Sequence, residues 1–174
     1  QQNRTRDVEI SIAIDFAEAV KGTTKELSLR VADNKNGGRK QENIKIKIPA
    51  GIDTGQAIKL EGKGEINQNG DRGDLYVRVQ VRSDSRFERE GSNIISKASI
   101  DMVEAALGTE IEVETISGKV KLKVPAGTQP GKVLKLSAKG MPIINTDRKG
   151  DHYVVINISI PTKLSGKQKE ALQN

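Results

Sequence analysis

Apolar residues alternate with polar ones along much of the chain, with a period of two. In residues 8–14 every second side chain is valine or isoleucine. A period of two places successive side chains on opposite faces of a β-strand, so this segment is predicted to be a strand with one buried face. The same pattern predicts strands within residues 27–31, 44–48, 75–81, 111–113, 120–124 and 154–160.

Two short segments break this period and are typical of helical turns. They are residues 16–20 and 102–107, and each runs into a glycine followed by threonine. Glycine commonly ends a helix because it adopts the left-handed conformation without strain. We therefore expect a mostly β chain with short helices.

The chain contains an internal repeat. Lys-Ile-Pro-Ala-Gly at 47–51 returns as Lys-Val-Pro-Ala-Gly at 123–127, and Gly-Asp-x-Tyr-Val closes both copies, at 73–77 and 150–154. The proline cannot donate to a strand ladder, so it should end the strand before it. Two copies of one small β fold are expected. They are assigned to residues 7–90 and 91–161, and residues 162–174 are the start of a helix that the chain cuts short.

Few residues suit catalysis or metal binding. Cysteine is absent and His152 is the single histidine, so neither a metal site nor a cofactor is expected. Asp74 and Asp151 might be taken for an acid pair, but they occupy the same turn of different copies, and a hydrogen-bonded turn aspartate is the better interpretation. No nucleophile, base and orienting group can be assembled, so the chain is not expected to be an enzyme.

The net charge is +6, and one lysine run stands out. Lys119, Lys121 and Lys123 alternate with apolar residues, which places them on the solvent face of a strand. No acidic residue lies between the six lysines of the run. These are Lys119, Lys121, Lys123, Lys132, Lys135 and Lys139.

Two interpretations of this run stay open. It is either a solvated face or a patch for acidic partners, so a basic β module that binds nucleic acid or another polyanion is the alternative function. Nucleic acid is the weaker case, because two tyrosines, two phenylalanines and no tryptophan leave little for base stacking. No run of about 20 apolar residues exists, so no membrane span is expected.

Residues 82–91, between the two copies, are polar except for Phe87. A lone aromatic residue in a charged connector is either a packing anchor or the wall of a binding site. The residues alone leave both open.

Taken together, the ordered motifs resemble the C-terminal substrate-binding region of the DnaJ/Hsp40 co-chaperones, over nearly the whole chain. The motifs are Glu-Ala-Val-Lys-Gly-Thr at 18–23, Ile-Pro-Ala-Gly-Ile at 48–52, Gly-Lys-Gly at 62–64, Gly-Asp-Leu-Tyr-Val at 73–77, Phe-Glu-Arg-Glu-Gly at 87–91, Glu-Ala-Ala-Leu-Gly at 104–108, Val-Pro-Ala-Gly-Thr at 124–128 and Lys-Gly-Met-Pro at 139–142. The resemblance implies two tandem β-sandwich-like domains in a cytoplasmic protein. They would bind unfolded polypeptide and present it to Hsp70.

The resemblance also implies a peptide-binding groove on the first domain, between its first two strands and the junction aromatic. The implied groove residues are Ile10, Ile12, Leu27, Leu29 and Phe87. Lys25 matches a position that in some relatives pairs with the acidic tail of Hsp70. An extended client segment could add a strand to a sheet edge there and place a large side chain in an apolar pocket.

Some family features are missing from this sequence. It contains no J domain and no His-Pro-Asp triplet, so it is not expected to stimulate Hsp70 by itself. Zinc-containing relatives insert a cysteine-rich module where this chain has residues 33–41, so that loop is either native or replaces a deleted module. The dimerising segment of the family is also missing, which leads us to expect a monomer or a weak homodimer.

Overall fold

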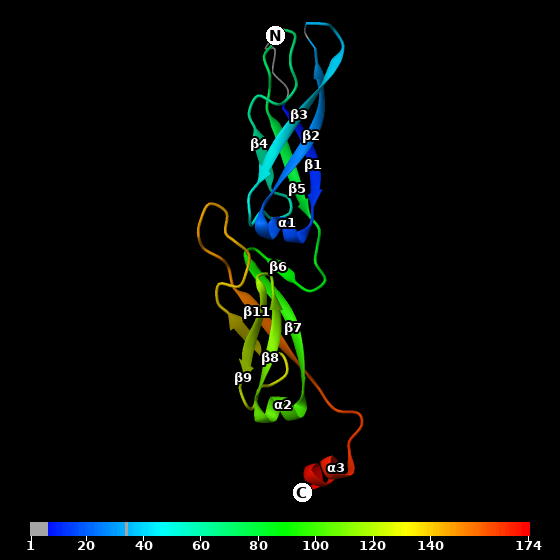
Figure 1. The fold of residues 1–174 in the computed structure, drawn as a ribbon, viewed down its shortest axis with the longest axis vertical. Helices are drawn as coiled ribbons and strands as arrows, with labels where there is room; N and C mark the ends of the chain where they lie inside the picture. The colour runs from blue at the N-terminus through cyan, green and yellow to red at the C-terminus, as the bar shows by residue number, and fades with distance from the viewer. Residues whose placement is uncertain (1–6, 34) are drawn as a thin grey trace. The chain divides into compact units, whose positions relative to one another are not determined.

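The computed structural model describes residues 7–33 and 35–174, which form two compact units (Figure 1). The first unit contains the described residues up to Ser85 together with Pro142–Arg148. The second unit contains Arg86–Met141 and Lys149–Asn174. Each unit holds one copy of the Pro-Ala-Gly element, at 49–51 and 125–127.

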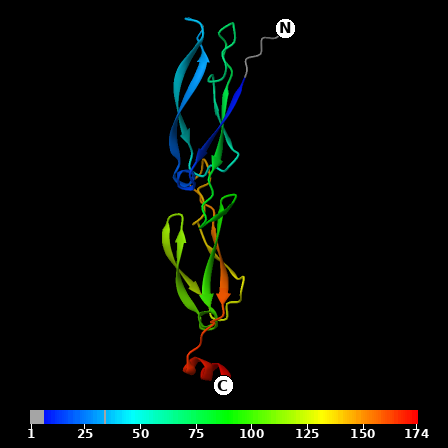
Figure 2. The ribbon, with the colours of Figure 1, turned by 90° about the vertical axis from the view of Figure 1, so that its right-hand side faces the viewer.

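The first unit consists of a three-stranded sheet, a two-stranded hairpin and a short helix. Its elements are β1 (Val8–Ile14), α1 (Phe16–Lys21), β2 (Thr23–Ala32), β3 (Arg39–Ile48), β4 (Ala57–Leu60) and β5 (Leu75–Val81). The sheet has the order β1-β5-β4, with β1 parallel and β4 antiparallel to β5. The β2–β3 hairpin is a separate antiparallel pair that lies alongside this sheet (Figures 1 and 2).

The second unit repeats this plan and adds one strand. Its elements are β6 (Glu88–Glu90), β7 (Asn93–Asp101), α2 (Met102–Leu107), β8 (Thr109–Thr115), β9 (Gly118–Val124), β10 (Val133–Leu136), β11 (His152–Ser159) and α3 (Gly166–Gln173). The sheet has the order β10-β11-β7-β6, and β8–β9 forms the hairpin. As in the first unit, the first long strand of the copy runs parallel to the last one, here β7 with β11. The mostly β fold is therefore confirmed.

The two equivalent helices begin and end in the same way. Asp15 precedes α1 and Asp101 precedes α2, and each takes part in a capping box with a glutamate three residues later. Each helix is followed by a glycine with positive φ. At the first of these, Gly22, an added Cβ would lie 3.0 Å from the backbone oxygen of Ile48, so the close approach of the end of β3 also favours glycine. The helices predicted from the sequence are confirmed.

Alternating burial along the strands forms a core in each unit. In the first unit, alternate residues of β3 and β5 are buried and the residues between them are more exposed. The buried ones are Ile44, Ile46, Ile48, Leu75, Val77 and Val79. The second unit is built on the same alternation. Its buried cluster contains Ile100, Ala105, Val113, Val124, Val154 and Ile156. Both β3 and β9 end directly before a proline, as the sequence predicts.

No helix among the described residues combines the length and the apolar character needed to cross a membrane.

Candidate functional site

Four large apolar side chains of the first unit are only half-buried. Ile10 and Ile12 lie on β1, and Leu27 and Leu29 lie on β2. Leu27 is the cross-strand partner of Ile44, a core residue, so its side of the hairpin faces inward. The four side chains therefore belong to the inner faces of their strands but stay partly open to solvent.

The equivalent positions of the second unit carry smaller or covered side chains. Counting back from the capping aspartates, Ile10 and Ile12 correspond to Ser96 and Ala98. Counting forward from the glycines after the helices, Leu27 and Leu29 correspond to Val113 and Thr115, which are only 5% and 4% exposed. At these four positions, large half-buried apolar side chains therefore occur only in the first copy.

Strand edges next to these side chains are open as well. Among the described strands, β1 pairs only with β5, and β2 pairs only with β3. In the second unit, the equivalent of β1 is β7, whose other edge pairs with β6 over Asn93–Ile95. An unpaired edge offers backbone N–H and C=O groups to an added strand. In the first unit, half-buried apolar side chains and open edges coincide.

Lys25 lies in the same inward-facing row of β2, opposite Ile46. Its ammonium group forms an ion pair with Glu18 of α1, with 2.8 Å between Nζ and Oε2. The other oxygen of Glu18 accepts a hydrogen bond from the backbone N–H of Asp15 at 3.0 Å. The hydrogen bond from Lys25, with that from Asp15, lowers the pKa of Glu18. Lys25 is therefore already paired with an acid of its own unit.

Phe87 belongs to the second unit and is 7% exposed. Its ring stands edge-on to the imidazole of His152, and the guanidinium carbon of Arg86 lies 5.0 Å from its ring centroid. The structure thus brings Phe87 together with His152, whereas the four half-buried side chains belong to the first unit.

The lysines of β9 are exposed, as their alternation predicts, but they face a row of glutamates. Lys119, Lys121 and Lys123 lie opposite Glu114, Glu112 and Glu110 of β8. Two diagonal ion pairs form, Lys119 with Glu112 at 3.8 Å and Lys121 with Glu110 at 3.9 Å. The surface is therefore a stripe of both signs, which gives little support to a polyanion-binding patch. In the sequence, the glutamates at 110, 112 and 114 alternate with the same period of two as the lysines, and this pattern could have predicted the pairing.

The turn aspartates play the structural role that the sequence predicts. Asp74 accepts a hydrogen bond from the backbone N–H of Gly62 at 3.0 Å. Asp151 accepts the equivalent bond from Ala138 at 2.9 Å. Each carboxylate also lies near the lysine of the neighbouring strand, Lys59 at 3.6 Å and Lys135 at 3.7 Å. The duplicated arrangement is a turn brace in each unit.

Comparison with known proteins identifies the family of the chain. The family model for the DnaJ C terminal domain matches residues 8–161. Among curated proteins, the Chaperone protein DnaJ of Bacillus cereus (strain AH820), of Bacillus anthracis and of Bacillus mycoides (strain KBAB4) are each 52% identical over 136 residues. The aligned part is 78% of this chain but 37% of each relative, so the chain spans little more than a third of their length. The chain belongs to the family of DnaJ C-terminal domains.

Proposed function

We propose that this chain is the polypeptide-binding part of a DnaJ chaperone and that the first unit captures unfolded or hydrophobic segments. The observation that carries the proposal is the row of Ile10, Ile12, Leu27 and Leu29, left half-buried beside open strand edges. The second unit, built on the same plan, carries either a smaller side chain or a buried one at each equivalent position.

Capture would combine two kinds of contact. Backbone hydrogen bonds to an open strand edge accept any extended sequence, and the apolar row selects segments with large hydrophobic side chains. Complete burial of one leucine or isoleucine side chain contributes about 1.5–3 kcal/mol, so two or three client side chains give useful but reversible binding. The function is binding and release, without a chemical step.

The partner that receives the client is proposed to be Hsp70, in the cytoplasm. Lys25 is the candidate contact for an acidic Hsp70 tail, because ion pairs between lysine and carboxylate are charge-assisted. An incoming carboxylate would have to replace Glu18 or share the ammonium group with it. Phe87 is the remaining proposed groove residue, on the strength of the family resemblance.

Salt dependence distinguishes apolar capture from polyanion binding. The experiment measures the binding of a reduced, denatured protein at about 0.05 M and about 0.5 M salt, since several lysine–phosphate contacts would lose orders of magnitude in affinity over such a range. Apolar capture should keep its affinity or gain slightly at high salt. A steep loss of affinity would contradict the proposed function.

A further inference from the structure

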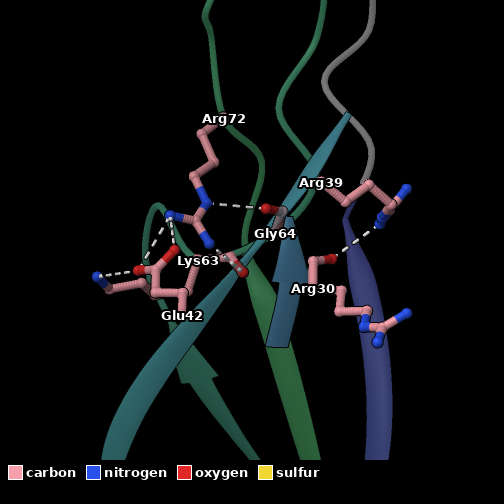
Figure 3. Close-up of polar contacts among 6 residues, drawn as sticks. All are labelled: Arg30, Arg39, Glu42, Lys63, Gly64 and Arg72. Atoms are coloured by element: carbon pink, nitrogen blue, oxygen red, sulfur yellow. Dashed lines mark hydrogen bonds and ion pairs between the residues drawn. The ribbon is translucent and has the colours of Figure 1, made fainter. Parts of the chain in front are cut away.

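A partly buried ion cluster holds the outer part of the β2–β3 hairpin (Figure 3). Glu42 of β3 accepts a hydrogen bond from Lys63 Nζ at 3.1 Å and from Arg72 Nη1 at 3.0 Å. Arg72 also donates to two backbone carbonyl oxygens, from Nε to Gly64 at 2.8 Å and from Nη2 to Lys63 at 3.1 Å. One carboxylate thus joins β3 to the connection between β4 and β5.

Glu42 occupies an inward-facing position. It continues the row of Ile44, Ile46 and Ile48 on β3, and its direct cross-strand partner is Leu29. Its side chain is 23% exposed and that of Arg72 is 18% exposed. Partial burial by itself would raise the pKa of Glu42, but the hydrogen bonds from Lys63 and Arg72 outweigh it and the pKa lies below its usual range.

The cluster lies toward the end of the hairpin that no chain connection joins to the rest of the unit. At one end, β2 follows α1 directly and β3 leads through Pro49 to β4, so both strands are joined to the rest of the unit. The other end is the turn between Ala32 and Arg39. There Arg39 adds a second tie, an ion pair with Glu65 at 3.2 Å. Without these ties the outer end of the hairpin would be anchored by packing alone.

The second unit lacks the equivalent cluster. Its hairpin strands have seven residues each, against ten in β2 and β3. Counting back from the Pro-Ala-Gly element, the position of Glu42 is taken by Gly118. The ion cluster therefore accompanies the copy that carries the half-buried apolar row.

We propose that Glu42 is a positioning residue of the client groove. By binding Arg72 and Lys63 it fixes the outer end of the β2–β3 hairpin, and with it Leu29, at the distance from β1 that client binding requires. The inference rests on the proposed function, because it assumes that Leu29 contacts the client. Glu42 itself does not need to touch the client.

The test measures the affinity of an uncharged, leucine-rich fluorescent peptide for Glu42→Gln. An uncharged probe responds to the position of the hairpin and not to the lost charge. Because substitutions that act through a packed network shift coupled equilibria modestly, affinity should fall about threefold to tenfold. Amide hydrogen exchange should quicken in β2 and β3 and stay unchanged in β1 and β5.

Two further variants complete the test, one as a control for the lost charge and one as a milder change in the same cluster. Glu26→Gln removes an exposed carboxylate from the outward face of the same hairpin, opposite Lys45, and should change nothing. Lys63→Gln removes only the more exposed partner of Glu42, whose side chain is 40% exposed, so the affinity should fall by less than in Glu42→Gln. This milder variant provides the test if Glu42→Gln folds poorly.

The outcomes separate the positioning role from the groove itself. If Leu29→Ser loses binding but folded Glu42→Gln and Lys63→Gln bind as the wild type does, the positioning role is overturned and the groove stands. A lower melting temperature with unchanged affinity would likewise reduce the cluster to a stabilising contact. If Leu29→Ser also binds normally, the groove assignment fails, and the role of Glu42 fails with it.

Discussion

The imidazole of His152 meets the ring of Phe87 edge-on, with the ring centroids 5.9 Å apart and the planes at 85°. His152 is fully buried in the second unit. Ser96 Oγ lies 2.6 Å from its Nε2, and its Nδ1 has no hydrogen-bond partner among the described residues. The site therefore suits a neutral imidazole, and burial lowers the pKa of His152 below its ordinary value of 6.5.

The second unit should lose stability as the pH falls below about 6.5, the pKa of a histidine in an unfolded chain. Below that pH the histidine of the unfolded chain is protonated, whereas folded His152 stays neutral. The free energy of unfolding is therefore highest above about pH 6.5 and falls by up to about 1.4 kcal/mol per pH unit below it. Chemical denaturation between about pH 7.5 and 5.5, above the carboxylate range, measures this. His152 is the only histidine, so the slope should vanish in His152→Gln, and a slope that persists there would contradict the assignment.

Phe87→Leu tests whether Phe87 also contacts the client. A leucine of similar volume should cost the second unit less than about 1.5 kcal/mol, which leaves it folded. If Phe87 forms a wall of the groove, capture of a denatured protein weakens several-fold while both units still melt cooperatively. Unchanged capture would make Phe87 a core anchor of the second unit alone.

Ala138 is a site for stabilisation, because its backbone has φ of +59° where the first unit has Gly62 at +68°. Alanine is strained in this left-handed region and glycine is not. Ala138→Gly should stabilise the second unit by about 0.5–1 kcal/mol and raise its melting temperature by about 2–6 °C in calorimetry. The reciprocal Gly62→Ala should destabilise the first unit through backbone strain alone. No atom lies within 4 Å of the added Cβ, so crowding does not contribute. A lower melting temperature for Ala138→Gly would show that the strain argument is wrong.

Glu18→Gln should make Lys25 available to an acidic partner. Glutamine preserves the capping box at the start of α1 but removes the charge that pairs with Lys25. An acidic peptide should bind this variant about two- to fivefold more tightly, the range expected for an exposed ion pair, and bind Lys25→Gln more weakly than the wild type.

A matched control exists in the second unit. Glu104 forms the same capping box, but Ile111 takes the place of Lys25, so Glu104→Gln should leave peptide binding unchanged. If Glu18→Gln weakens binding as Lys25→Gln does, Lys25 is not the contact for acidic partners.

Local rules were enough to predict much of the fold. Strict alternation identified residues 8–14 and 75–81 as strands, and both match β1 and β5 residue for residue. The helix ending before Gly108 and the braces at Asp74 and Asp151 followed from turn chemistry alone. These features depend on residues at most 13 positions apart, so the local sequence is enough to predict them.

Features that depend on distant pairing could not be predicted in this way. The β6 and β7 strands were missed, because β6 is three residues long and β7 mixes Ser and Lys into its inner and outer faces. Cross-strand neighbours decide that Lys121 faces Glu112 and that Glu42 meets Arg72, thirty residues away. Tertiary packing likewise decides that Leu27 is half-buried, whereas its equivalent Val113 is buried.

The most direct test of the account is the affinity of Leu27→Ser for a denatured client, measured against Leu107→Ser. Leu107 is 76% exposed on α2, so its replacement removes a comparable apolar side chain from the second unit. If the first unit holds the groove, Leu27→Ser weakens capture about tenfold, the effect of losing part of one buried leucine contact, and Leu107→Ser has no effect. Equal affinities for the two variants, with both proteins folded, would contradict the assignment of client binding to the first unit.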